Sequence, residues 1–167
     1  MNDSIGIKVK YLDTSAIIKL YLDEDGSSNF REYFHSHTNF CTAIMTFYEA
    51  MNVLKSKLHK KESQDKYYGA VTDLAIHGWG GKIELESIDL NQKDTFKAVS
   101  DLAMSSNLDI ADAIQIHAIL KGKYAHFTRE SASVLITADE PQELVAQQNK
   151  IRVWNCRKEP KPEWLDN

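Results

Sequence analysis

Short apolar runs alternate with longer amphipathic segments along most of the chain. The runs that predict strands lie at residues 7–12, 39–43, 83–88, 133–137 and 151–154. The segments with apolar side chains at helical spacing lie at 16–22, 28–35, 44–58, 63–77, 91–104, 109–120 and 140–147. Strands that alternate with helices favour a parallel sheet covered on both faces. The pattern therefore predicts an α/β protein.

The length of 167 residues fits one domain of ordinary size. A composition with 43% hydrophobic and 26% charged residues is typical of a globular protein. We expect residues 1–155 to form the domain. Residues 156–167 are rich in Lys, Glu and Pro, which predicts a loosely held C-terminal tail.

Charge and cysteine content exclude several kinds of protein. With 20 Lys and Arg against 24 Asp and Glu, the net charge of −4 excludes binding to nucleic acid through bulk positive charge alone. Cys41 and Cys156 lie far apart, which argues against a disulfide framework or a structural zinc site. The first residues lack the pattern of a signal peptide and no apolar stretch reaches about 18 residues, so we expect neither a secretion signal nor a membrane span. We expect a cytoplasmic protein that does not enter the membrane.

Four acidic residues stand out by their positions. Asp13 and Asp139 each follow an apolar strand, and ligands of open parallel sheets bind beyond the carboxyl ends of the strands. Glu49 and Asp112 lie within helices, surrounded by apolar residues. A carboxylate in such surroundings needs a partner or a metal ion, because burial of an unpaired charge costs several kcal/mol. The predicted fold would bring all four acids to one end of the sheet.

Each acid also has an ordinary structural explanation. Asp13 and Asp139 could cap the helices that follow them. Glu49 lies three residues after Thr46, which is the spacing of a capping box. Asp112 could be a solvated residue on an exposed helix face. The hypothesis of a shared site therefore depends on the convergence of all four carboxylates.

A cluster of this composition has a defined chemistry. Hard divalent cations prefer oxygen ligands, so a site of Asp and Glu without His or Cys favours Mg²⁺ or Mn²⁺ over Zn²⁺. One or two such ions can activate a water molecule for in-line attack on a phosphodiester and stabilise the leaving oxyanion. Without the metal, the gathered carboxylates repel one another, and at least one should have a raised pKa.

Four short motifs occur in an order that resembles PIN-domain nucleases, most closely the compact PIN toxins of toxin–antitoxin pairs (the VapC type). The motifs are YLDTS at 11–15, TFYEAM at 46–51, IADAIQIHA at 110–118 and LITAD at 135–139. The resemblance covers about residues 8–154. It implies a three-layer α/β/α sandwich with a central, mainly parallel sheet.

The resemblance also implies an activity, which is metal-dependent endonucleolytic hydrolysis of single-stranded segments in structured RNA. The ligands of Mg²⁺ or Mn²⁺ would be Asp13, Glu49, Asp112 and Asp139. The hydroxyls that orient metal-bound water or phosphate would be that of Thr137 and that of either Thr14 or Ser15. The implied partners are a second copy of the chain, in a homodimer, and a small antitoxin that often places an Arg in the acidic pocket.

Two features depart from the pattern of the family. Asp112 and Asp139 are 27 residues apart, a longer interval than expected, with the extra residues at about 122–129. Asp139 is followed by Glu140 and Pro141 in place of a basic residue, so its role as a metal ligand is the least secure.

Two basic groups could guide RNA phosphates to such a site, or they could be ordinary solvated surface. The first group comprises Lys55, Lys57, His59, Lys60 and Lys61. The second comprises Lys121, Lys123 and Arg129, with Tyr124 and Phe127 between them as possible stacking partners for bases.

Three other functions stay open. A phosphotransferase similar to the haloacid dehalogenases would use Asp13 as a nucleophile, but it needs a second Asp where this chain has Ser15. A module with the PIN fold could bind RNA or protein without cutting, although the presence of all four acids speaks against it. A metal-dependent nuclease that acts on DNA shares the acidic chemistry, but it would normally need a larger chain.

Overall fold

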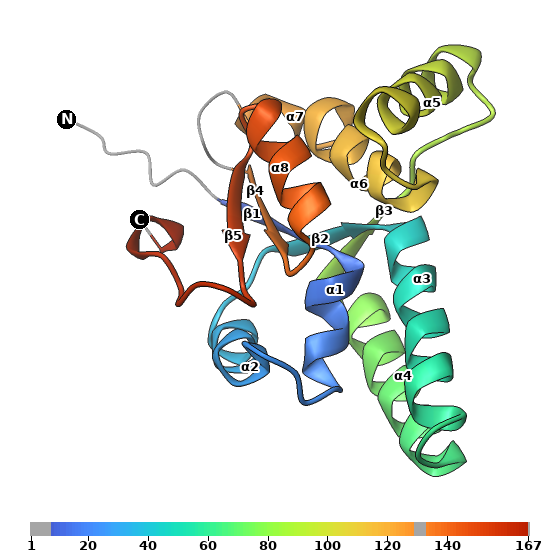
Figure 1. The fold of residues 1–167 in the computed structure, drawn as a ribbon, viewed down its shortest axis with the longest axis vertical. Helices are drawn as coiled ribbons and strands as arrows, with labels where there is room; N and C mark the ends of the chain where they lie inside the picture. Colours follow the sequence, from blue (N-terminus) through green and yellow to red (C-terminus); the bar gives the residue numbers. More distant parts are fainter. Residues whose placement is uncertain (1–7, 129–132, 167) are drawn as a thin grey trace.

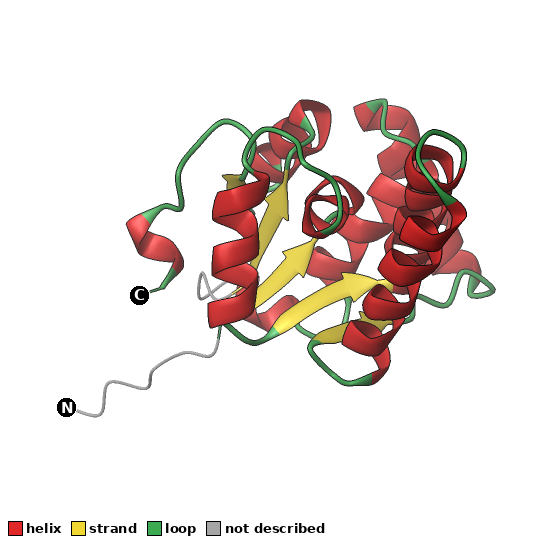
Figure 2. Ribbon diagram, turned by 90° about the horizontal axis from the view of Figure 1, so that it is seen from below, coloured by secondary structure: helices red, strands yellow, loops and turns green. Residues whose placement is uncertain are grey.

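The computed structural model describes residues 8–128 and 133–166, in which a sheet lies between two layers of helices (Figures 1 and 2). The strands of the sheet are β1 (Val9–Leu12), β2 (Phe40–Ala43), β3 (Ile83–Glu86), β4 (Ser133–Thr137) and β5 (Arg152–Asn155). Every predicted strand is therefore present, with bounds that differ by at most two residues, and those of β4 are the same as predicted. Ile7, which began the first predicted strand, lies outside the described residues.

The sheet is parallel throughout, with the strand order β3-β2-β1-β4-β5. The central strand β1 pairs with β2 and β4, so that Tyr11 lies opposite Cys41 on one side and Leu135 on the other. Because the strands run in one direction, the residues that follow them emerge at the same edge. The fold class predicted from the sequence is confirmed.

The two faces of the sheet are covered by different parts of the chain. The first layer comprises α1 (Thr14–Ile17), the 3₁₀ turn η1 (Ile18–Leu20), α2 (Ser27–Ser36), α3 (Ile44–Leu54), the π-helical turn η2 (Lys55–His59) and α4 (Gln64–Trp79). The second comprises α5 (Lys93–Ser106), α6 (Ile110–Lys121) and α8 (Glu140–Gln148). None of the helices within residues 8–128 and 133–166 has the length and apolar character that a membrane-spanning helix requires.

Alternating residues of the strands build two separate hydrophobic cores. Leu12 and Ile136 point into the core of the first layer, whereas Tyr11 and Leu135 point into the core of the second. All four are fully buried. The strands β1 and β4 are therefore buried on both faces, as expected for inner strands of a parallel sheet.

The helix after β1 differs from its prediction at both ends. It begins at Thr14, two residues early, because the Asp13 side chain caps its first turn by accepting a hydrogen bond from the Ser15 N–H. After Ile17 the α-helix becomes the 3₁₀ turn η1, which ends at Leu20. The short helix α7 (Ala125–Thr128), within the segment of extra residues, was not predicted.

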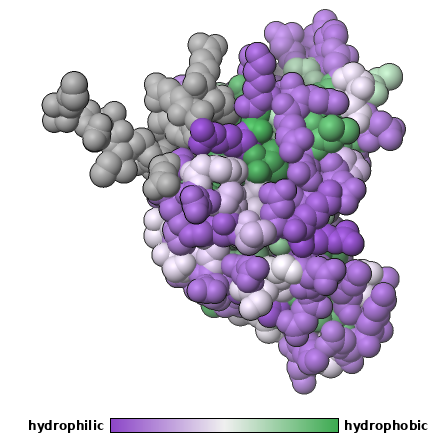
Figure 3. Space-filling view, turned by 60° about the vertical axis from the view of Figure 1, so that its left-hand side comes forward, coloured by the Kyte–Doolittle hydropathy of each residue, from purple (hydrophilic) through white to green (hydrophobic). Residues whose placement is uncertain are grey.

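The C-terminal segment is not the loosely held tail that its composition predicts. Leu165, at 1% exposure, belongs to the core of the first layer. The indole Nε1 of Trp154 donates a hydrogen bond to the Glu159 carbonyl (3.1 Å), and His37 Nε2 lies 3.1 Å from Asp166 Oδ1. Figure 3, which brings this side of the molecule forward, shows mainly hydrophilic side chains with apolar ones gathered in the upper half. Two residues of this charged segment, Cys156 and Leu165, are therefore buried in the core of the first layer.

Gly26 allows this segment to approach the start of α2. Its φ of +81° lies in the left-handed region, and a Cβ at this position would lie 1.8 Å from the Cys156 carbonyl oxygen. Any other residue at position 26 would therefore push the C-terminal segment away from the core.

Candidate metal-binding active site

Asp13 lies at the carboxyl end of β1 and is only 2% exposed. Its Oδ2 accepts hydrogen bonds from the Ser15 N–H (3.1 Å), the Ser15 hydroxyl (2.6 Å) and the Thr137 hydroxyl (3.1 Å). Its Oδ1 is buried and has no hydrogen-bond partner among the described residues. Burial raises the pKa of Asp13, although the hydrogen bonds from Ser15 and Thr137 act in the opposite direction. The residue therefore caps α1, as its structural explanation predicts, and still has one oxygen without a partner.

Glu49 is joined to the end of β1 through Thr14. The Thr14 hydroxyl donates a hydrogen bond of 2.5 Å to Glu49 Oε2, which fixes the carboxylate on α3 beside the first turn of α1. The capping-box explanation for Glu49 is wrong. The N-cap of α3 is Ala43, and the Thr46 hydroxyl donates instead to Gln115 Oε1 (3.1 Å).

Thr137 and Ser15 hold the turn between β4 and α8 against the end of β1. The Thr137 hydroxyl oxygen accepts a hydrogen bond from the Asp139 N–H (3.0 Å), and the Ser15 hydroxyl oxygen accepts one from the Ala138 N–H (2.7 Å). Asp139 occupies the N-cap position of α8, but its side chain makes no capping hydrogen bond. The partly buried carboxylate of Asp139 is therefore not engaged in capping α8.

Asp112 lies in the first turn of α6 and is partly buried. Its Oδ1 accepts a hydrogen bond from Gln142 Nε2 (3.2 Å) on α8. The helix is capped by Asp109, whose Oδ1 accepts the Asp112 N–H (2.9 Å). Asp109 is therefore a fifth acid near the candidate site, and it is not among the acids predicted from the sequence. Its position three residues before Asp112 was the signal that could have identified it.

The four predicted acids share one electrostatic environment. Burial, followed by the charges of Asp13, Asp109, Asp139 and Glu49, raises the pKa of Asp112 to about 8. The pKa of Glu49 is raised by burial and by Asp109 and Asp13, against the hydrogen bond from Thr14. Burial and the charge of Asp13 also raise the pKa of Asp139. Asp13 and Asp139 follow β1 and β4, Glu49 is joined to the end of β1 through Thr14, and Asp112 is joined to α8 through Gln142, so the four side chains lie at the same end of the sheet.

The model of the PIN domain family matches residues 10–147, a range that contains all four acids and most of the chain. The chain belongs to the PIN-domain family. PIN domains have a nuclease-type fold and generally use divalent metals. The crystal structure of PAE2754 from Pyrobaculum aerophilum is similar to this PIN domain, with a TM-score of 0.56 and 16% sequence identity over 90% of this chain and 87% of that chain. At this identity the likeness shows the fold alone. No curated protein matches the chain.

The donor set of this PIN domain fits a hard divalent cation. Four carboxylates without His or Cys are the ligands that Mg²⁺ and Mn²⁺ prefer, and the buried Asp13 Oδ1 lacks a partner that a cation would supply. None of the ion pairs in the described part of the chain involves these four acids. Within residues 8–128 and 133–166, no three Asp, Glu, His or Cys side chains are close enough together to coordinate an ion as they stand.

Gln115 is a residue of the PIN domain that sequence reasoning missed. It lies on α6 one turn after Asp112 and is fully buried. Its Nε2 donates to the Leu12 carbonyl (3.1 Å), and its Oε1 accepts from the Ala43 N–H (2.9 Å) as well as from Thr46. One amide thus joins β1, α3 and α6, the elements that position three of the four acids. A Gln within the apolar motif IADAIQIHA was the available signal.

Replacement of Gln115 by Leu should destabilise the protein. The substitution leaves the Ala43 N–H and the Thr46 hydroxyl without their acceptor, and a buried unsatisfied group costs about 1–3 kcal/mol. We expect the free energy of unfolding to fall by about 2–4 kcal/mol in urea denaturation. The control is Gln64→Leu at an exposed position of α4. Equal stability of the two variants would contradict this role of Gln115.

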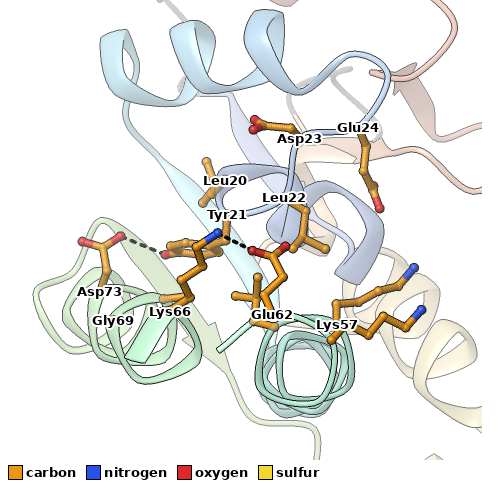
Figure 4. Close-up of a pocket in the computed structure, with 13 residues that line it drawn as sticks. Leu20, Tyr21, Leu22, Asp23, Glu24, Lys57, Glu62, Lys66, Gly69 and Asp73 are labelled. Atoms are coloured by element: carbon orange, nitrogen blue, oxygen red, sulfur yellow. Dashed lines mark hydrogen bonds and ion pairs between the residues drawn. The ribbon is translucent and has the colours of Figure 1, made fainter. Parts of the chain in front are cut away.

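A hollow of about 700 Å³ lies elsewhere on the PIN domain, between the segment after η1 and the hairpin of η2 and α4 (Figure 4). None of the four acids lines it. Lysines and carboxylates alternate along its wall, where the Tyr21 hydroxyl donates to Asp73 (3.0 Å) and Lys66 pairs with Glu62 (2.5 Å). Because its wall carries both positive and negative side chains and none of the four acids, this hollow is distinct from the candidate active site.

The two basic groups differ in how closely their positive side chains lie to carboxylates that neutralise them. Lys57 and Lys61 of the first group line the hollow beside its carboxylates. In the second group, Lys123 pairs with Glu84 (2.5 Å), and the Tyr124 hydroxyl donates to the same carboxylate (2.6 Å). Arg129 and the side chain of Phe127 lie outside the described residues. The pairing with Glu84 reduces the charge that the second group offers to phosphate.

Proposed function

We propose that this PIN domain is a divalent-metal-dependent endoribonuclease that hydrolyses RNA phosphodiester bonds. The observation that carries the proposal is the gathering of Asp13, Glu49, Asp112 and Asp139 at the carboxyl end of a parallel sheet, with raised pKa values and no basic partner among the residues that the structure describes. The site therefore has an excess of negative charge that a cation would balance. The choice of RNA as substrate follows from the likeness of the four motifs to those of PIN ribonucleases.

Some residues of the site would bind the cation, and others would hold the binding residues in place. The four acids would hold Mg²⁺ or Mn²⁺, which would activate water and stabilise the leaving oxyanion when bound. Asp13 is fixed for this role by Ser15 and Thr137, and Glu49 is fixed by Thr14. Because the groups that hold these carboxylates are neutral hydroxyl and amide groups, they add no positive charge that would compete with the cation.

We further propose that the protein is the toxin of a type II toxin–antitoxin pair and forms a homodimer. The support is the order and sequence of the four motifs, which are most similar to those of VapC-type toxins. The site is also suited to inhibition by a partner. Four acids without a basic partner in the described chain would accept an Arg from an antitoxin, which would neutralise the charge that holds the cation.

The proposed activity is tested with the purified protein, fluorescently labelled structured RNA and DNA of the same sequence. We expect internal cleavage of the RNA with Mg²⁺ or Mn²⁺, loss of cleavage when EDTA is added, and recovery when excess Mn²⁺ follows. The RNA fragments are separated on denaturing gels.

Other results would identify the competing functions. Cleavage of DNA at the same rate as RNA would contradict specificity for RNA, and cleavage in EDTA would contradict the metal mechanism. Binding of RNA without any cleavage under these conditions would favour a non-catalytic binding module.

A further inference from the structure

Gln142 is a fully buried residue in the first turn of α8, three residues after Asp139. Its Nε2 donates a hydrogen bond to Asp112 Oδ1 at 3.2 Å. This bond joins the helix that carries Asp112 to the helix that follows Asp139. Gln142 therefore contacts one acid directly and is close in sequence to another.

The amide oxygen of the same side chain lacks a partner. Three buried side-chain atoms have no hydrogen-bond partner in the described part of the chain, and they are Asp13 Oδ1, Gln142 Oε1 and Tyr33 Oη. Tyr33 lies on α2, whereas the other two belong to the residues around the acidic site. A buried polar group without a partner costs about 1–3 kcal/mol. Asp13 is one of the four acids and Gln142 contacts another, so both orphan oxygens would gain a partner from a species at the site that offers positive charge or N–H and O–H groups.

The chemical nature of Gln142 suits a role beside a cation. Its amide donates to Asp112 without adding positive charge, whereas a Lys or Arg at this position would compete with the cation for the carboxylates. The bond holds one oxygen of Asp112, and the other has no partner in the described chain. Groups of this kind set the orientation of metal ligands in many proteins.

We propose that Gln142 is a positioning residue of the cation site, which orients Asp112 through Nε2 and gains a partner for Oε1 when the cation and its water shell are bound. The inference rests on the proposed function, because it assumes that the acids bind a divalent cation. It adds a residue from α8 to the site that neither the family motifs nor the four acids include.

The test compares Gln142→Leu with Gln147→Leu, which makes the same change at an exposed position of α8. Binding of Mn²⁺ to metal-free protein is measured by titration calorimetry without RNA, and thermal unfolding is measured in EDTA. We expect Mn²⁺ to bind about 10-fold or more weakly to Gln142→Leu, as is typical after loss of a group that orients a ligand. The unfolding temperature in EDTA should be unchanged or higher, because Leu removes the unsatisfied amide oxygen. Gln147→Leu should match the wild type in both measurements.

A purely structural Gln142 would behave in the opposite way. The Leu variant would then unfold at a lower temperature and bind Mn²⁺ as the wild type does, which would overturn the inference and leave the proposed function intact. Gln142→Met provides a second variant, and failure of both variants to fold would likewise show a structural role and overturn the inference. Failure of the wild-type protein to bind Mn²⁺ would overturn the metal-dependent function and this inference together.

Discussion

Asp13→Asn should abolish metal-dependent cleavage while the protein remains folded. The amide oxygen of Asn can take the place of Oδ2 and accept the same three hydrogen bonds from Ser15 and Thr137. The amide nitrogen then occupies the position of Oδ1, which has no partner to lose. The substitution therefore preserves the cap of α1 and removes the negative charge from the most buried of the four acids.

The expected loss is large because Asp13 would contact the cation directly. Removal of a residue that only orients a metal ligand reduces affinity or activity by about 10–100-fold, so loss of a ligand should exceed 100-fold. The initial rate of RNA cleavage with saturating Mn²⁺ measures this effect, and circular dichroism checks the fold. Asp101→Asn, at an exposed position on α5, is the matched control. A variant at Asp13 that cuts RNA at the wild-type rate would rule out the proposed mechanism.

Asp112→Asn should also inactivate the enzyme, but it should stabilise the metal-free protein. The pKa of Asp112 is about 8 in the folded protein, well above its ordinary value of 3.8. Between these two pH values the folded state binds more protons than the unfolded state, so the free energy of unfolding falls as the pH rises through this window. Asn cannot ionise and keeps an oxygen that can accept the hydrogen bond from Gln142. The variant therefore lacks this loss of stability.

Urea denaturation in EDTA at pH 4, 6 and 8.5 measures the difference between wild type and Asp112→Asn. The two should be equally stable at pH 4, and the variant should gain about 1–2 kcal/mol at pH 8.5, because partial exposure of Asp112 screens its charge. Added Mn²⁺ should stabilise the wild type at pH 8.5 and have a much smaller effect on the variant. A variant that is less stable than the wild type at pH 8.5 would show that the charge of Asp112 is compensated without metal.

Local sequence patterns predicted the strands, most helices and the places of the acids. These features depend on the nearest neighbours in the chain, such as the apolar run before Asp13 or the helical spacing around Asp112. The structure placed the four acids in one electrostatic environment, which the topology of a parallel sheet had implied. Their coordination of a metal stays a prediction.

The features that the sequence did not reveal depend on contacts between distant segments. Gln115 is joined to Ala43 across 72 positions, and Gln142 is joined to Asp112 across 30. Either residue could equally have been a solvated Gln on a helix surface. Leu165 was overlooked because the residues around it are charged, and composition alone cannot show that one side chain reaches the core.

The anchored C-terminal segment determines where the chain could be attached to another molecule. Lys8, which precedes β1, donates from Nζ to the Trp164 carbonyl, and His37, which precedes β2, pairs with Asp166. The segment begins at the carboxyl end of β5, but its last residues, Trp164 and Asp166, therefore lie at the amino ends of the strands, whereas the acids lie at the carboxyl ends. A tether or reporter fused to the C-terminus would leave from the edge opposite the acids, and large substrates could still reach them on an immobilised protein.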